Sequence, residues 1–151
     1  MEEGRIRVQA EPFDIGREIA RLHEDALGVG AVASFLGVVR DENDERSVGS
    51  MLLEHYPGMT ERAIEGIVRD ARSRWPVSAV TVVHRIGALS PGDPIVLVVA
   101  ASSHRGDAFA ACEFIMDFLK TKAPFWKKES TPHGERWVGT RGSDLAALER
   151  W

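Results

Sequence analysis

Residues 95–101 form an unbroken apolar run, and this run constrains the fold more than any other feature of the chain. It follows the strong turn signal Ser90-Pro91-Gly92-Asp93-Pro94. The run is far short of the ~20 apolar residues that a membrane helix needs, and it is typical of a central strand in a sheet. A helix with an apolar face is expected next, from about Asp107 to Thr121, and Pro124 ends it.

Strand and helix patterns alternate along the rest of the chain. One helix is expected after Asp14, which can serve as its N-cap, and another is expected to contain Pro57 in its first turn. The segment 31–39 reads as a mostly buried strand, and the highly charged segment 40–49 reads as an exposed, mobile loop. The remaining expected elements are strands at 6–8, 50–56 and 80–86, a hairpin over 125–138 and a short final helix capped by Ser143 or Asp144.

Several of these connections look like hairpins. We therefore predict an α+β fold with a largely antiparallel or mixed sheet, in preference to a doubly wound parallel sheet. No repeat, low-complexity stretch or linker divides the sequence, so residues 1–151 are expected to form a single domain.

The composition argues against several classes of function. A single cysteine, Cys112, rules out an internal disulfide and a Cys-rich zinc site, and its place on the apolar face of a helix indicates a buried side chain. The histidines lack the spacing of a metal site and no nucleotide-binding glycine motif is present, so neither a metal nor a cofactor is expected. A net charge of −4 argues against general nucleic-acid binding. The acidic start lacks a signal-peptide pattern, so the cytoplasm is the expected location.

One basic cluster stands out in this acidic chain. Residues 120–128 carry four lysines and no acid. Lys127 shares one face of an extended segment with Phe125 and Glu129, and a tight corner joins that segment to the helix that carries Lys120. The two lysines are therefore expected to converge on one site and to lower at least one lysine pKa. Lysines at a helix end also favour the helix dipole, so a solvated helix end is the alternative interpretation.

Other positions suit an anionic ligand. His104 and Arg105 stand between the central strand and the next helix, where backbone N–H groups and a guanidinium can bind a phosphate. Capping of that helix by Ser103 or Asp107, with His104 and Arg105 as polar loop residues, explains the same segment without a function. Arg40, after an apolar strand, and Arg141, among glycines, stay ambiguous from spacing alone.

Longer motifs follow one another in the order of a known family. They are Leu-Glu-His-Tyr-Pro-Gly-Met-Thr at 53–60, Val-His-Arg-Ile-Gly at 83–87, Ser-His-Arg at 103–105, Phe-Ile-Met-Asp at 114–117, Lys-Thr-Lys-Ala-Pro-Phe-Trp-Lys-Lys-Glu at 120–129 and Arg-Trp-Val at 136–138. Over nearly the whole chain, the sequence resembles the catalytic (large) subunit of molybdopterin synthase.

This resemblance implies a fold, an assembly and a reaction. The fold is an α/β hammerhead arrangement with an additional small antiparallel β-sheet. The assembly is a homodimer at the centre of a heterotetramer, with a small ubiquitin-like sulfur-carrier subunit at each end. The carrier's C-terminal Gly-Gly thiocarboxylate would enter the catalytic pocket and deliver sulfur to cyclic pyranopterin monophosphate, forming the dithiolene of molybdopterin. Because the sulfur arrives on the partner, a lone buried Cys112 raises no difficulty.

The resemblance also implies roles for individual residues. Lys120 would act as general acid/base or as transient covalent partner of the carrier tail, and Lys127 would stabilise developing negative charge. Some substrate-binding residues would reach the site from the second protomer. The substrate-binding set is Phe35, Val38, Val39, Arg40, His104, Arg105, Met116, Lys120, Lys127, Lys128, Glu129 and Arg141, with Phe35 and Met116 as apolar walls. Many relatives have a basic or polar residue in place of Val38, so a contact there would use the backbone.

Two other functions fit the same lysines. A non-catalytic anion- or partner-binding module on this fold would show the same cationic patch. A lysine-dependent enzyme that forms a Schiff base with a carbonyl substrate would use the same pair. Alanine substitution at Lys120 or Lys127 separates the binder from an enzyme, because a binder loses affinity gradually whereas an enzyme loses orders of magnitude in rate. Borohydride trapping with carbonyl compounds tests the Schiff-base enzyme.

Overall fold

The computed structural model describes residues 5–43, 46–47, 49–132, 134–139 and 142–151. The helices and strands expected from the sequence are present, with bounds shifted by a few residues. In chain order the elements are β1 (Ile6–Gln9), α1 (Ile15–Arg21), β2 (Ala31–Val38), β3 (Glu42–Asn43), β4 (Arg46–Ser47), β5 (Ser50–His55), α2 (Met59–Arg74), β6 (Val77–Arg85), β7 (Gly87–Leu89), β8 (Pro94–Ser102), α3 (Arg105–Lys122), β9 (Phe125–Thr131), β10 (Gly134–Val138), α4 (Gly142–Ala147) and a 3₁₀ turn at Leu148–Arg150.

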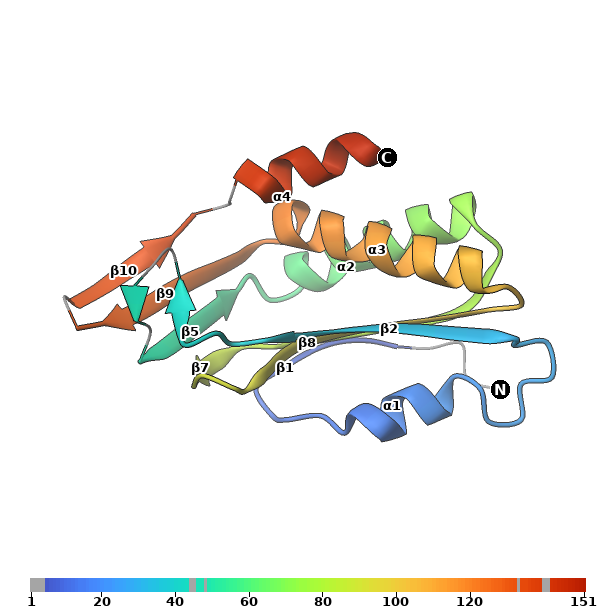
Figure 1. Ribbon diagram of the computed structural model, residues 1–151, viewed down its shortest axis with the longest axis horizontal. Coiled ribbons are helices and arrows are strands. Elements are labelled where there is room, and N and C mark those ends of the chain that lie inside the picture. The colour runs from blue at the N-terminus through green and yellow to red at the C-terminus, as the bar shows by residue number, and fades with distance from the viewer. Residues whose placement is uncertain (1–4, 44–45, 48, 133, 140–141) are drawn as a thin grey trace.

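The larger sheet has the strand order β1-β6-β8-β2. β1 and β6 run parallel, whereas β8 pairs antiparallel with both β6 and β2. β8 is therefore an inner strand, which confirms the central strand predicted from the apolar run. Figure 1 shows α2 and α3 on one face of this sheet and α1 on the other.

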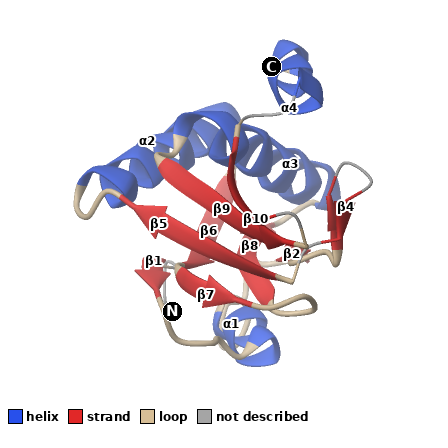
Figure 2. Ribbon diagram, turned by 90° about the vertical axis from the view of Figure 1, so that its left-hand side faces the viewer, coloured by secondary structure: helices blue, strands red, loops and turns tan. Residues whose placement is uncertain are grey.

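A second sheet has the order β10-β9-β5-β7 and is antiparallel throughout. It lies at one end of the larger sheet, as the views in Figures 1 and 2 show. β5 leads into α2 and β9 follows α3, so the two helices that cover the larger sheet also connect it to the smaller one. The predicted α+β class, with a mixed sheet and an additional antiparallel sheet, is confirmed.

Alternate residues of β8 enter two different hydrophobic cores. Val96, Val98 and Ala100 pack in the main core with α2 and α3, and Leu97 and Val99 pack in the smaller core with the α1 region. Both faces of β8 are covered, which favours apolar side chains on both sides of the strand and explains the unbroken apolar run at 95–101.

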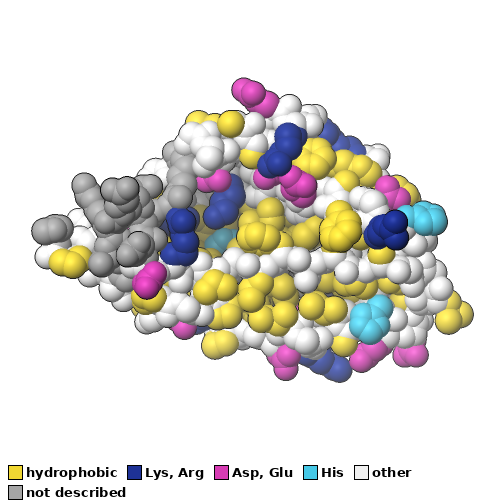
Figure 3. All heavy atoms as spheres, in the orientation of Figure 1, with side chains coloured by type: hydrophobic (Ala, Val, Ile, Leu, Met, Phe, Trp, Pro, Cys, Tyr) yellow, Lys and Arg dark blue, Asp and Glu magenta, His cyan; other side chains and the backbone are white. Residues whose placement is uncertain are grey.

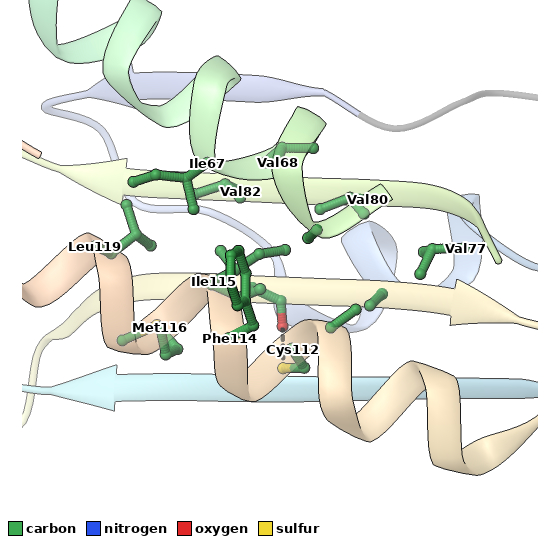
Figure 4. Packing of buried hydrophobic residues seen from close by; sticks show 14 of the residues in the cluster. Ile67, Val68, Val77, Val80, Val82, Cys112, Phe114, Ile115, Met116 and Leu119 are labelled. Atoms are coloured by element: carbon green, nitrogen blue, oxygen red, sulfur yellow. Dashed lines mark hydrogen bonds between the residues drawn. The ribbon is translucent and has the colours of Figure 1, made fainter. Parts of the chain in front are cut away.

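The main core joins α2, α3 and β6. Figure 4 shows Ile67 and Val68 of α2 facing Val82 of β6 and Ile115 of α3. The predicted inward stripe of α2 is confirmed by its buried residues, except that Ala63 is only half-buried. Among the described residues, no helix has the length and apolar character needed to cross a membrane.

Local signals set the ends of the helices. The side chain of Asp14 accepts a hydrogen bond from the backbone N–H of Arg17 at 3.0 Å and caps α1, as predicted. α3 ends at Lys122, and Ala123 takes an extended conformation because Pro124 follows it. This sharp end turns the chain directly into β9.

Two predictions about the segments before β5 are wrong. Segment 31–39 is not mostly buried, because β2 lies at the edge of the sheet and pairs only with β8. Ser34, Phe35 and Leu36 are accordingly exposed. The charged segment 40–49 is not a loop throughout, because β3 and β4 pair as a short antiparallel ladder within it.

Two predicted helix starts also need correction. α2 begins at Met59 with Gly58 as its N-cap, so Pro57 precedes the helix instead of occupying its first turn. Gly58 has a φ of 82°, a conformation that favours glycine and lies outside the helical region. The helix therefore starts only after Gly58. Ser143 and Asp144 lie inside α4, which begins at Gly142, and do not stand before it as a cap.

Candidate active site

A pocket of about 300 Å³ opens where the two sheets meet. Its walls come from the end of β2, the start of β8, the C-terminal turns of α3, one face of β9 and the start of α4. Figure 3 shows Lys, Arg and His side chains gathered around a hollow, with hydrophobic side chains beside it. Segments that are distant in the sequence therefore build one cationic pocket with apolar walls.

Lys120 and Lys127 both line this pocket, from the last turns of α3 and from β9. Pro124 forms the corner between these elements, and its carbonyl oxygen accepts a hydrogen bond from Oγ1 of the buried Thr60 at 3.0 Å. Thr60 Oγ1 in turn accepts the backbone N–H of Tyr56 at 2.9 Å. The start of α2 thus holds the corner that brings the two lysines to one pocket.

The side chains of β9 divide between two faces. Phe125, Lys127 and Glu129 line the pocket, as the strand alternation predicts. Lys128 does not line it. Its Nζ lies 2.8 Å from Oε2 of Glu135 on the neighbouring strand. Lys128, which the resemblance places among the binding residues, therefore faces away from this pocket.

The segment that follows β2 forms a second wall. Val38, Val39 and Arg40 all line the pocket, with Val39 buried and Val38 exposed. The backbone N–H of Val39 donates to the carbonyl of Asp93 at 2.9 Å, and its carbonyl accepts from Gly92 at 2.8 Å. These two bonds fix the segment from which Arg40 extends.

Of the two residues expected to form apolar walls, only Met116 lines the pocket. Met116 is buried and lines the pocket one helical turn before Lys120. Phe35 is not among the lining residues, and its side chain is 41% exposed on the edge strand. Within this chain, Phe35 therefore presents its ring to the surroundings of β2 and not to the pocket.

His104 and Arg105 lie at the opposite end of α3 from Lys120. At a rise of 1.5 Å per residue, that helix separates Arg105 from Lys120 by roughly 22 Å. Within one chain, neither residue lines the pocket that contains Lys120. Arg141 lies outside the described residues.

His84 is a pocket residue that the sequence reasoning missed. It lies near the end of β6 and stacks on Phe125, with 3.8 Å between ring centroids and 18° between ring planes. Burial, assisted by the positive charges of Lys127 and Lys120, lowers the pKa of His84 to about 4. In the sequence, the one indication that His84 belongs to the site was its place in the family motif at 83–87.

The described side chains offer neither a reactive thiol nor a metal-binding cluster. Cys112 is buried, its Sγ donates to the carbonyl of Val98 at 3.8 Å, and burial raises the pKa of its thiol to about 11. This confirms the buried cysteine expected from the sequence. Among the described residues, no group of three or more His, Cys, Asp or Glu side chains is placed to hold a metal ion.

Comparison with known proteins identifies the family. The family model described as MoaE protein matches residues 8–122. The molybdopterin synthase catalytic subunit of Pseudomonas aeruginosa is 58% identical over 146 residues, which is 97% of each chain. The subunit of the same name from Escherichia coli (strain K12) is 54% identical over 154 residues and covers 100% of each chain.

A solved structure gives the same result. The molybdopterin biosynthesis MoaE protein from Burkholderia ambifaria superposes with a TM-score of 0.84 at 55% sequence identity, covering 98% of this chain and 97% of that chain. The chain therefore belongs to the MoaE protein family, as the motifs predicted. Its relatives named above are described as molybdopterin synthase catalytic subunits or as molybdopterin biosynthesis proteins.

Proposed function

We propose that this chain is the catalytic subunit of a molybdopterin synthase and works in molybdenum cofactor biosynthesis. In this proposal, sulfur passes from the C-terminal thiocarboxylate of a small ubiquitin-like carrier subunit to cyclic pyranopterin monophosphate. Family membership supports it, because the relatives from Pseudomonas aeruginosa and Escherichia coli bear the name of this catalytic subunit.

The observation that carries the proposal is that Lys120 and Lys127 line one pocket. Arg40 lines the same pocket, so three basic side chains surround a space that suits a cyclic phosphate and a thiocarboxylate. Met116 and Phe125 add apolar surface for a flat ring. The absence of a reactive thiol is consistent with this role, since the carrier brings the sulfur.

The two lysines divide the chemistry. Lys120 acts as general acid/base or as a transient covalent partner of the carrier tail. Lys127 stabilises the negative charge that develops on the substrate or on the leaving carboxylate. For each sulfur, a carbon–sulfur bond on the substrate replaces a carbon–oxygen bond, one oxygen staying on the phosphate as its ring opens and the other leaving as water. The carbon–sulfur bond of the carrier is cleaved by water, so the carrier tail leaves as a carboxylate. Successive carrier tails supply both sulfurs of the dithiolene.

The length of α3 bears on the assembly. We infer that His104 and Arg105 serve the pocket of the second protomer in a homodimer, because α3 holds them roughly 22 Å from Lys120 of their own chain. This placement keeps both residues in the substrate-binding set. The homodimer then forms the centre of a heterotetramer with a carrier subunit at each end.

A reconstituted assay tests the proposed reaction. The purified chain is mixed with thiocarboxylated carrier and cyclic pyranopterin monophosphate, and dithiolene product is oxidised to its fluorescent derivative. The same carrier with an ordinary C-terminal carboxylate is the matched control and should give no product. Product that depends on the thiocarboxylate supports the proposal. Absence of product at high enzyme concentration contradicts it.

A further inference from the structure

Besides its basic side chains, the pocket contains a hydrogen-bond acceptor, Nε2 of His84. Nδ1 of His84 lies 2.8 Å from the backbone carbonyl oxygen of Arg85. Because a carbonyl can only accept, Nδ1 carries the proton and Nε2 keeps a lone pair. Within the described part of the chain, no group donates a hydrogen bond to Nε2.

The orientation of this ring is fixed from two sides. One face is stacked on Phe125, with ring centroids 3.8 Å apart, and Nδ1 is held by the Arg85 carbonyl. The backbone of His84 is also paired with Val96 across the larger sheet. A ring held in this way presents Nε2 in one direction, which is what a site that recognises a ligand requires.

The ring is also neutral near pH 7. Burial is the main cause of its low pKa of about 4, and the charges of Lys127 and Lys120 act in the same direction. A pKa this far below the ordinary lysine value of about 10.4 makes His84 a poor base toward a lysine ammonium. Nε2 can therefore accept a hydrogen bond from a ligand, but it is not suited to remove a proton from a lysine.

We propose that His84 is a specificity-determining residue whose Nε2 accepts a hydrogen bond from a ring N–H of the bound pterin. This inference rests on the proposed function and deepens it by naming the part of the substrate that is recognised. Phosphate and thiocarboxylate oxygens are acceptors, so they pair with lysine or arginine and not with Nε2. A reduced pterin presents several N–H donors on a flat ring, which fits an acceptor beside apolar walls.

Two substitutions at position 84 separate the acceptor from the shape of the ring. His84→Phe keeps a flat ring that can stack on Phe125 but removes the acceptor. His84→Gln loses the stacking and places an amide oxygen near the position of Nε2. Calorimetry at pH 7 measures the binding of cyclic pyranopterin monophosphate, with pyrophosphate as a probe of the cationic part alone. His23→Phe, at an exposed position, is the matched control.

The expected pattern is specific to the pterin. His84→Phe weakens binding of the pterin roughly tenfold, because a ligand N–H then loses its acceptor in a partly dry site. His84→Gln weakens it less, and His23→Phe leaves it unchanged. Pyrophosphate binding stays the same in all variants. Unchanged pterin affinity in His84→Phe overturns the inference. An equal loss of affinity for the pterin and for pyrophosphate also overturns the inference, because that result would indicate a damaged pocket.

Kinetics separate this inference from the proposed function. In the dithiolene assay, His84→Phe should raise KM for the pterin and leave KM for the carrier unchanged. A rise confined to the carrier would assign the acceptor to an amide of its tail and overturn the inference. If the variants show the pterin-specific binding pattern but wild-type protein makes no dithiolene, the inference is supported while the proposed reaction is contradicted.

Discussion

Trp151 donates its indole N–H to Oδ2 of Asp117 on α3 at 2.7 Å. Its ring also meets Trp75 and Phe114 edge-on, with centroids 5.4 Å and 5.6 Å away. The start of α4 lines the pocket and Trp151 lies beyond the other end of that helix. This contact therefore anchors the segment that forms one wall of the pocket.

Removal of this anchor should destabilise the protein. Trp151→Ala loses the ring contacts and the hydrogen bond, and we expect a loss of roughly 2–4 kcal/mol in the free energy of unfolding. Trp151→Phe keeps most of the ring contact and should cost about 1 kcal/mol for the bond to Asp117. Urea unfolding measures both changes. Leu27→Ala, at a fully exposed side chain, is the control and should have no effect. Equal stability of all variants would contradict the anchoring role.

Lys120 and Lys127 should be essential for rate more than for binding. Lys120→Ala and Lys127→Ala are each expected to reduce kcat by roughly 10²–10⁴ in the dithiolene assay, as for loss of a general acid/base or of a charge-stabilising group. Lys122→Ala, on the exposed end of the same helix, is the matched control. Parallel, gradual losses of affinity alone would instead favour a binding module. A borohydride-trapped adduct with a carbonyl compound would favour the Schiff-base reading.

Mixed dimers test the proposed place of Arg105. Arg105→Ala and Lys120→Ala should each be inactive as pure proteins. After the two are mixed and subunits have exchanged, one of the two pockets in each mixed dimer combines an intact Lys120 with an intact Arg105. About a quarter of wild-type activity should return for a dimer with twofold symmetry. If both residues acted within the same chain, mixing would restore no activity.

His84 should make the protein sensitive to acid. Its pKa is about 4 in the folded protein against 6.5 for an ordinary histidine. Between these values the unfolded chain binds a proton that the folded chain does not, so stability falls as the pH is lowered from 6.5 to 4. The contribution of His84 to this loss is about 3 kcal/mol.

The measurement compares wild-type protein with His84→Phe by urea unfolding from pH 4 to pH 8. The variant lacks the titrating ring, so its stability should fall less steeply across the window, and the two curves should converge toward low pH. His23→Phe, on the exposed surface, should follow wild type. Curves that stay parallel throughout would show that the ring titrates normally when the protein is folded.

Gly30 should tolerate no side chain. A Cβ atom at this position would lie 2.4 Å from the backbone carbonyl oxygen of Ser103, at the junction of β2 and β8. Gly30→Ala is therefore expected to destabilise the fold by roughly 1–3 kcal/mol. Gly28→Ala, where nothing lies within 4 Å of the added carbon, should leave the unfolding midpoint unchanged or slightly higher. Equal midpoints for the two variants would count against the steric account.

Prediction of the fold from sequence succeeded where one strand or helix carries its own pattern. β8 was predicted because both of its faces are buried, which leaves residues 95–101 apolar without a break. β2 has a mostly apolar sequence interrupted by Ser34 and Gly37, but its exposure depends on which strands pair beside it. Composition alone does not distinguish an inner strand from an edge strand, and the burial of Phe35 was therefore predicted wrongly.

The same distinction applies to the site. Lys120 and Lys127 lie close in sequence across a proline corner, so their convergence could be predicted from the local chain. His84 reaches the pocket through pairing of β6 with β8 and a stack on Phe125, which no sequence spacing reveals. The proposed role of His104 and Arg105 depends on a second copy of the chain, and the sequence of one copy does not show where such a copy would lie.

Cys112 is the one cysteine of the chain, and it lies in the core with a poorly acidic thiol. In the proposed reaction, the subunit that guides sulfur transfer thus has no sulfur nucleophile of its own to be oxidised, alkylated or trapped as a mixed disulfide. Oxidative control of the reaction through a thiol then falls on the carrier and on whatever loads it.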